Sequence, residues 1–150
     1  MSSHEYKIHD LMIEDLTVAD EKLTDLIKEI ADLYLKNDRA WVIGFSGGKD
    51  STVILSLIFQ ALTTLTKRQL NKNVYVVCSD TLVETPVVVG LVREVLNKVQ
   101  MSANEKGIPL VTQMVVPDTN NTFWSNLLGK GYPAPTKGFR WCTERMKIKP

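Results

Sequence analysis

Residues 41–51 read WVIGFSGGKDS, and this stretch decides the fold. Its first five residues, Trp41 to Phe45, are apolar and do not alternate with polar ones. This predicts a strand that is covered on both faces, as in a parallel sheet. The glycine pair that follows marks a sharp turn. From Ser51 to about Thr66 the chain is apolar almost all round, which predicts a well-buried helix.

The rest of the chain continues this alternation of helix and strand. An amphipathic pattern with Thr17 as N-cap precedes the first strand. Thr85 and Pro86 are typical of a helix start, and Gly107 suits a left-handed stop at the helix end. The predicted elements, in order, are helix Thr17–Lys36, strand Trp41–Phe45, helix Ser51–Thr66, strand Val74–Cys78, helix Pro86–Glu105 and strand Leu110–Val116.

This order indicates right-handed crossovers and an α/β fold, with a doubly wound, mostly parallel sheet flanked by helices. We expect residues 1–16 to form an N-terminal leader and residues 17–150 one domain. Sheets of this class usually have more strands than the three found here. We therefore expect the domain to be truncated at its C-terminus, as the N-terminal part of a longer protein.

Composition excludes several classes of protein. The chain has 150 residues and a formal net charge of +1, so nothing global favours nucleic-acid or membrane binding. Its two cysteines are not a disulfide framework, and no apolar stretch is long enough to cross a bilayer. We expect a cytoplasmic protein that does not bind membranes. Charge is uneven, however, because residues 130–150 carry an excess of five positive charges.

The segment from Ser46 to Ser51 has the chemistry of a phosphate-binding loop. It follows a strand and opens a helix, where ligands of open α/β sheets bind. Gly47 and Gly48 let backbone amides approach an anion, and the helix N-terminus and Lys49 add positive charge. Asp50 would repel a bare phosphate, so its presence favours a Mg²⁺ ion between carboxylate and phosphates.

The loop fits neither of two common nucleotide motifs. Gly44 and Gly48 enclose three residues rather than four, and Asp50 stands where a Walker A loop has serine or threonine. The GxGxxG pattern is absent as well. The alternative to a phosphate site is a structural turn that merely uses small residues.

Two further clusters lie at or beyond the ends of predicted strands. In the first, CSDTLVETP at residues 78–86, Asp80 is a candidate for a metal or a ribose hydroxyl; alternatively it is only a turn residue. Cys78 is interpreted as a small core residue. In the second, FRWCTERMKIKP at 139–150, the cations would clamp or stabilise a phosphate; the alternative is a solvated basic tail with a buried cysteine. The candidates in this second cluster are Arg140, Cys142, Arg145 and Lys147.

The SGGKDS segment after an apolar strand resembles the PP-loop ATP pyrophosphatase superfamily, whose signature is SGGxDS. The resemblance implies cleavage of ATP between the α- and β-phosphates, with the loop holding the departing pyrophosphate. It also implies an adenine nucleotide alpha hydrolase-like fold. The nucleotide-binding residues expected from it are Phe45, Ser46, Gly47, Gly48, Lys49, Asp50, Ser51 and Asp80.

Three other segments narrow the resemblance. SDTLVETP, FWSNLLGKGYPAP and FRWCTERMKIKP are similar to the DndC-type sulfurtransferase of bacterial DNA phosphorothioation, within the phosphoadenylylsulfate reductase-like branch. This implies activation of a DNA backbone phosphate for sulfur insertion, a cysteine desulfurase as sulfur donor, and other phosphorothioation proteins as partners. It further implies a [4Fe–4S] cluster with Cys142 as first ligand. No cysteine follows Cys142, so only a longer form could hold the whole cluster.

Two other functions remain open on the sequence. One is a reductase of phosphoadenylylsulfate or adenylylsulfate, which would bind a small sulfonucleotide and need no DNA. The other is a non-catalytic nucleotide-binding module that scaffolds partner proteins.

Overall fold

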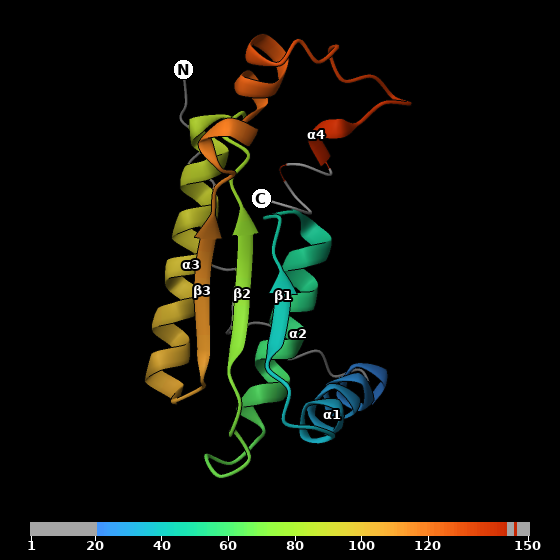
Figure 1. Cartoon of the computed structure of the whole chain (residues 1–150). Helices are drawn as coiled ribbons and strands as arrows, with labels where there is room; N and C mark the ends of the chain where they lie inside the picture. Colours follow the sequence, from blue (N-terminus) through green and yellow to red (C-terminus); the bar gives the residue numbers. More distant parts are fainter. Residues whose placement is uncertain (1–20, 144–145, 147–150) are drawn as a thin grey trace, which may run out of the picture.

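The computed structural model describes residues 21–143 and residue 146. Its elements follow one another in the predicted order (Figure 1). The predicted N-cap Thr17, the leader 1–16, and the candidates Arg145 and Lys147 lie outside the described residues. The elements are α1 (Glu21–Leu35), β1 (Trp41–Gly44), α2 (Lys49–Thr63), β2 (Val74–Ser79), α3 (Pro86–Lys106), β3 (Leu110–Val115), the 3-10 turn η2 (Thr119–Asn121), the π-helical turn η3 (Ser125–Gly129) and α4 (Trp141–Thr143).

The three strands form one parallel sheet in the order β1-β2-β3. In register, Trp41 lies opposite Val74, and Val74 lies opposite Leu110. Because the spatial order follows the chain, both crossovers step in the same direction, and right-handed crossovers then place α2 and α3 on the same face. Figure 1 shows both helices behind the strands. The chain is therefore an α/β protein whose all-parallel sheet is flanked by helices.

The helices cover only one face of the sheet, so the prediction that the first strand is covered on both faces was wrong for the part of the chain described. Ile43 and Val76 are buried toward the helices, whereas Val42 is 72% exposed and Val111 is 44% exposed. The apolar run 41–45 does not alternate in polarity although its burial does. Strand β1 therefore has hydrophobic side chains on both of its faces, but helices pack on only one of them.

Helix α2 also departs from its prediction. It was expected to be buried almost all round, but Val53 and Ile54 are more than half exposed. Its buried side chains, which include Leu55 and Phe59, face the core. The helix also begins at Lys49, two residues before the predicted start, so the end of the SGGKDS segment forms its first turn.

The ends of α3 agree with the sequence signals. Thr85 takes an extended conformation before the helix, and Pro86 is at its start. Gly107 follows the last turn with φ of 67°, and its N–H donates to the Asn104 carbonyl while that of Ile108 donates to Ala103. This pair of bonds is a Schellman motif, which needs a left-handed residue and therefore favours glycine.

At the amino end of the sheet, α1 is joined to the strands by a buried polar cluster. The Tyr34 hydroxyl donates to the Lys72 carbonyl at 2.6 Å, and Lys72 Nζ donates to the Asn37 carbonyl at 2.7 Å. Lys72 is only 6% exposed, and its ammonium lies 4.4 Å from the Tyr34 ring centroid and 5.4 Å from that of Trp41. Cation–π contacts of this kind offset part of the cost of burying the charge.

Candidate functional site

The SGGKDS segment forms a sharp elbow between β1 and α2. The Phe45 N–H donates to the Val77 carbonyl at 2.8 Å, which continues the parallel ladder past β1, and the Phe45 side chain is buried. Gly47 then turns the chain with φ of 74°, and Gly48 is extended before the helix. Residues 46–50 are exposed and Ser51 is half-buried. The elbow therefore presents itself to solvent at the carboxyl end of the sheet.

Hydroxyl groups hold the elbow closed on itself. Ser51 Oγ donates to the Gly48 carbonyl at 2.9 Å and lies 3.1 Å from Ser46 Oγ. The N–H groups of Ser46 and Gly48 point at these two hydroxyl oxygens over 3.4 Å. Thr52 Oγ1 also donates to the Gly48 carbonyl, at 2.9 Å. The two serines of the motif thus have a structural role in shaping the loop.

The two glycines are required for different reasons. A Cβ on Gly47 would lie 2.6 Å from Val92 Cγ2 of α3, and its positive φ is itself unfavourable for other residues. A Cβ on Gly48 would meet only Ser46 Oγ, at an ordinary 3.5 Å, and its φ is −83°. Fold and sterics therefore explain Gly47. They do not explain Gly48, which occupies the N-cap position of α2 and whose N–H donates to Ser46 Oγ.

Lys49 and Asp50 lie in the first turn of α2 and are exposed. Neither side chain is paired with another residue in the part of the chain that the structure describes. A purely structural turn gives no reason for an adjacent ammonium and carboxylate without partners. Both groups are free to meet a bound molecule.

The Asp80 carboxylate, by contrast, is bonded within its own loop and to α3. It follows β2 and is only 5% exposed, and its N–H donates to the Val115 carbonyl. One carboxylate oxygen accepts the Leu82 N–H at 2.9 Å, and the other lies 3.9 Å from Arg93 Nη2 of α3. Leu82 has φ of 61°, a strained value for a leucine. The structure shows Asp80 in the turn role that was the alternative for it; a contact with ribose or metal stays a prediction.

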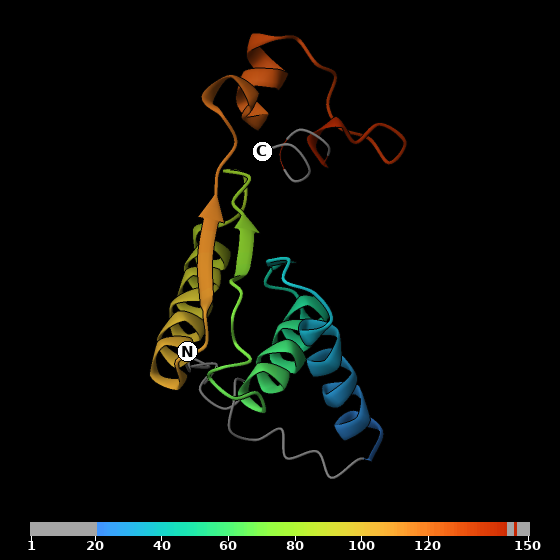
Figure 2. The ribbon, with the colours of Figure 1, turned by 60° about the horizontal axis from the view of Figure 1, so that its bottom comes forward.

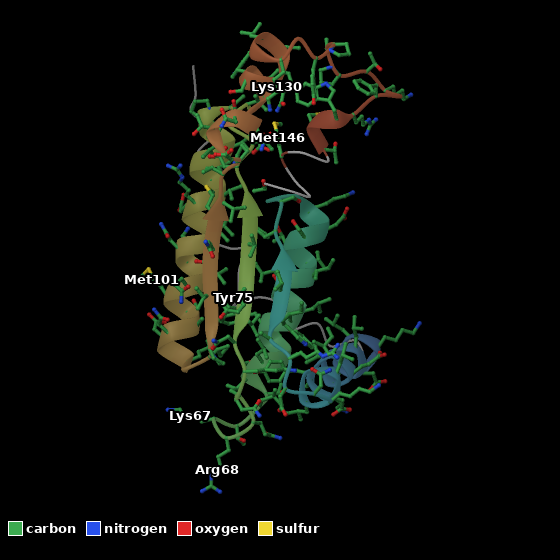
Figure 3. All side chains as sticks on the ribbon, viewed as in Figure 1. Lys67, Arg68, Tyr75, Met101, Lys130 and Met146 are labelled. Atoms are coloured by element: carbon green, nitrogen blue, oxygen red, sulfur yellow. The ribbon has the colours of Figure 1, made fainter. Side chains whose placement is uncertain are left out.

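The third cluster returns to the carboxyl end of the sheet. Ser79 Oγ, at the end of β2, donates to the Met146 carbonyl at 2.6 Å, and Met146 is buried. Figure 3 labels Met146 above the carboxyl ends of the strands. This contact brings the segment that carries Arg140 and Cys142 toward the loop of Asp80. Arg140 is exposed and Cys142 is half-buried.

Trp141 anchors this segment to residues on either side of η3. Its ring stacks on that of Phe123, with centroids 5.5 Å apart, and meets Tyr132 edge-on at 5.3 Å. Its Nε1–H donates to the Pro133 carbonyl at 2.9 Å.

Asn126, in η3, is fully buried. Its side-chain amide donates to the Asn121 and Thr122 carbonyls, and its Oδ1 has no partner among the described residues.

Sequence reasoning missed several residues that shape the site. Val92 packs against the elbow, Arg93 pairs with Asp80, and Ser79 holds Met146. None has a local signal, because each acts on a residue distant in the sequence. The full burial of Asn126 had no signal either, although asparagine is a rare choice inside an otherwise apolar stretch.

Within residues 21–143 and 146, no three His, Cys, Asp or Glu side chains gather in a group that could hold a metal. Cys78 is buried in the core, as predicted. A magnesium ion commonly uses one or two protein carboxylates together with substrate phosphates, so Asp50 alone could supply the protein ligand of such a site.

Among the described helices, none is long and apolar enough to cross a membrane.

Comparison with known proteins gives one informative similarity. The chain is 30% identical over 142 residues to an uncharacterized protein of Methanocaldococcus jannaschii. The alignment covers 94% of this chain and 25% of that relative, so the chain spans about a quarter of the relative's length. No family model and no solved structure matches.

Proposed function

We propose that this chain is an ATP pyrophosphatase domain of the PP-loop type, which activates a DNA backbone phosphate for sulfur insertion. The observation that carries the proposal is the elbow at residues 46–51. It lies at the carboxyl end of β1 and at the start of a 15-residue helix, with Lys49 and Asp50 exposed and unpaired in the described part of the chain. Anionic ligands of open α/β sheets bind at this place.

The residues of the elbow would grip the β- and γ-phosphates. The backbone N–H of Gly47 would meet a phosphate oxygen, and that of Gly48 would exchange its long bond to Ser46 Oγ for one to phosphate. The helix N-terminus would add about 0.3–1 kcal/mol. Lys49 adds a charge-assisted hydrogen bond of about 1.5–3 kcal/mol. The hydroxyls of Ser46 and Ser51 hold the loop shape in advance, so little ordering is needed when the nucleotide binds.

Asp50 would hold Mg²⁺ together with the phosphate oxygens, and the bound ion would neutralise charge on the departing pyrophosphate. Phe45 would support the nucleotide site from the core beneath the elbow, and Asp80 would do so by setting the shape of its loop. The reaction transfers AMP from ATP to an acceptor oxygen and releases pyrophosphate. Arg140, Cys142, Arg145 and Lys147 would handle the acceptor phosphate and the sulfur, with a cysteine desulfurase as donor.

We propose likewise that the three strands belong to a larger, doubly wound sheet in a longer, cytoplasmic protein. The open face supports this, since Val42 and Val111 are exposed there. The relative is about four times the aligned length. Such a longer form could also supply the cysteines that would complete a [4Fe–4S] cluster with Cys142 and the surfaces for other phosphorothioation proteins.

The test is to incubate the chain with Mg²⁺ and ATP labelled at the α- or γ-phosphate, and to resolve the products. With no DNA present, water is the acceptor of the adenylyl group, so we expect AMP and pyrophosphate. We expect Asp50→Asn to abolish both. Asp32→Asn is the matched control, because Asp32 is an exposed aspartate on α1. Formation of ADP and phosphate would exclude the proposed chemistry.

The same assay separates the two other functions. A reductase would bind adenylylsulfate or phosphoadenylylsulfate more tightly than ATP and would be indifferent to DNA. A scaffold would bind ATP without releasing pyrophosphate, and its cellular function would survive Lys49→Ala and Asp50→Ala.

A further inference from the structure

A short hairpin projects from the carboxyl-end region of the molecule. Thr136 and Phe139 exchange two backbone hydrogen bonds of 3.1 Å, which close a tight turn over Lys137 and Gly138. Figures 1 and 2 show the segment between η3 and α4 reaching away from the sheet. The hairpin is thus a defined structure although it packs against little else.

The base of the hairpin is firmly held. Trp141, the next residue after it, is buried, and its indole N–H donates to the Pro133 carbonyl on the other arm. Trp141 also stacks on Phe123, two residues before η3, which holds this arm against the preceding segment. A tip presented on such a base can contact a partner without a large cost in ordering.

The tip exposes an aromatic ring between two cations. Phe139 is 49% exposed, and Lys137 and Arg140 are exposed. Neither cation is paired with a described residue, whereas Lys130, nearby in sequence, donates to the Asn120 carbonyl and to Asn121 Oδ1. Residues 119–143 contain no Asp or Glu at all. The tip is therefore positive and carries an apolar ring.

We infer that this hairpin, residues 136–140, binds single-stranded nucleic acid. Lys137 and Arg140 contact successive phosphates, and the Phe139 ring stacks on a base between them. Positive charge combined with an exposed aromatic face is the composition of single-strand binding surfaces. A duplex fits less well, because its base faces are covered by their neighbours and only a displaced base can reach the ring.

This inference deepens the proposed function, since it gives the DNA acceptor a docking element and specifies that the strand is locally unpaired. The hairpin can nevertheless be tested independently of the elbow. Pyrophosphate release without DNA reports on the elbow alone, and oligonucleotide affinity without ATP reports on the hairpin alone. Failure of one measurement is therefore distinguishable from failure of the other.

The experiment measures fluorescence anisotropy of a labelled oligothymidylate of about 12 nucleotides, a length within the usual site sizes, titrated with the 150-residue chain. We expect Phe139→Leu to weaken binding about tenfold and Phe139→Tyr to retain it. Lys137→Gln should lower the slope of log affinity against log salt by about 0.7. Neither Phe139→Leu nor Lys137→Gln should change pyrophosphate release without DNA.

Matched controls come from exposed residues elsewhere. Leu128→Ala removes an apolar side chain that is 75% exposed, and Lys67→Gln removes a cation at the opposite end of the molecule (Figure 3); neither should change binding. Equal affinity for a duplex of the same length, or no loss on Phe139→Leu, would overturn the inference. Absence of oligonucleotide binding by the wild-type chain would overturn it as well, and would favour a protein as the partner of the tip.

Discussion

The two ends of the sheet use their polar groups in opposite ways. At the amino end, Tyr34 and Lys72 are buried and bond to each other and to the Asn37 carbonyl. At the carboxyl end, Lys49 and Asp50 are exposed and, within the described residues, unpaired. Buried polar groups that bond to one another stabilise the fold, whereas exposed groups at the carboxyl end of a parallel sheet are available to a ligand. Under the proposed function, the amino end therefore stabilises the fold and the carboxyl end binds the ligand.

The largest effect is expected at the amino end. Tyr34→Ala removes a fully buried ring together with its hydrogen bond, and should lower the free energy of unfolding by about 3–5 kcal/mol. Leu33→Ala, at a position 53% exposed on the same helix, should change it by less than about 0.5 kcal/mol. Urea unfolding measures both. Equal losses for the two variants would contradict the structural role of this end.

At the carboxyl end the effect should fall on activity instead. Lys49→Met is expected to reduce pyrophosphate release by about 10²–10³-fold, as for removal of one donor to a developing charge. Unfolding should be unchanged within about 0.5 kcal/mol, because the side chain is exposed. Lys36→Met, an exposed lysine after α1, serves as control. A large stability loss with intact activity would reverse the assignment of the two ends.

The two glycines of the elbow are expected to differ in the same way, Gly47 affecting stability and Gly48 affecting ligand binding. Gly47→Ala should cost about 1–3 kcal/mol of stability, because it forces a left-handed alanine against Val92. Val92→Ala will itself destabilise the core, but in that background Gly47→Ala should cost less than it does in the wild type. Gly48→Ala should leave stability within about 1 kcal/mol yet weaken ATP binding, which calorimetry would measure. The comparison fails if Gly48→Ala binds ATP as the wild type does.

The smallest effect concerns pH. Burial raises the pKa of Tyr34 above its ordinary value of 10.0, and the Lys72 amide N–H opposes the shift. Above pH 10 the unfolded chain loses this proton first, so the native state binds more protons and stability falls as pH rises. Unfolding curves between neutral pH and about pH 11 should therefore show a steeper decline for the wild type than for Tyr34→Phe. Parallel curves would contradict the burial of the hydroxyl.

Features with local signals were predictable from the sequence. The elbow needed only an apolar strand and two glycines, and the ends of α3 were marked by Thr85, Pro86 and Gly107. Contacts between distant segments were not predictable, since Ser79 meets Met146 across 67 positions and Gly47 depends on Val92 of another helix. The open face escaped prediction because an apolar side chain does not reveal whether another layer covers it.

In the proposed function, the elbow binds the pyrophosphate part of ATP. This binding is tested directly by following backbone amide resonances while Mg²⁺ and pyrophosphate are titrated into the labelled chain. We predict that the amides of residues 46–51 shift together and that those near Tyr34 and Lys72 do not, with AMP alone leaving the elbow unchanged. Elbow resonances that stay in place as Mg²⁺ and pyrophosphate are added would contradict the claim.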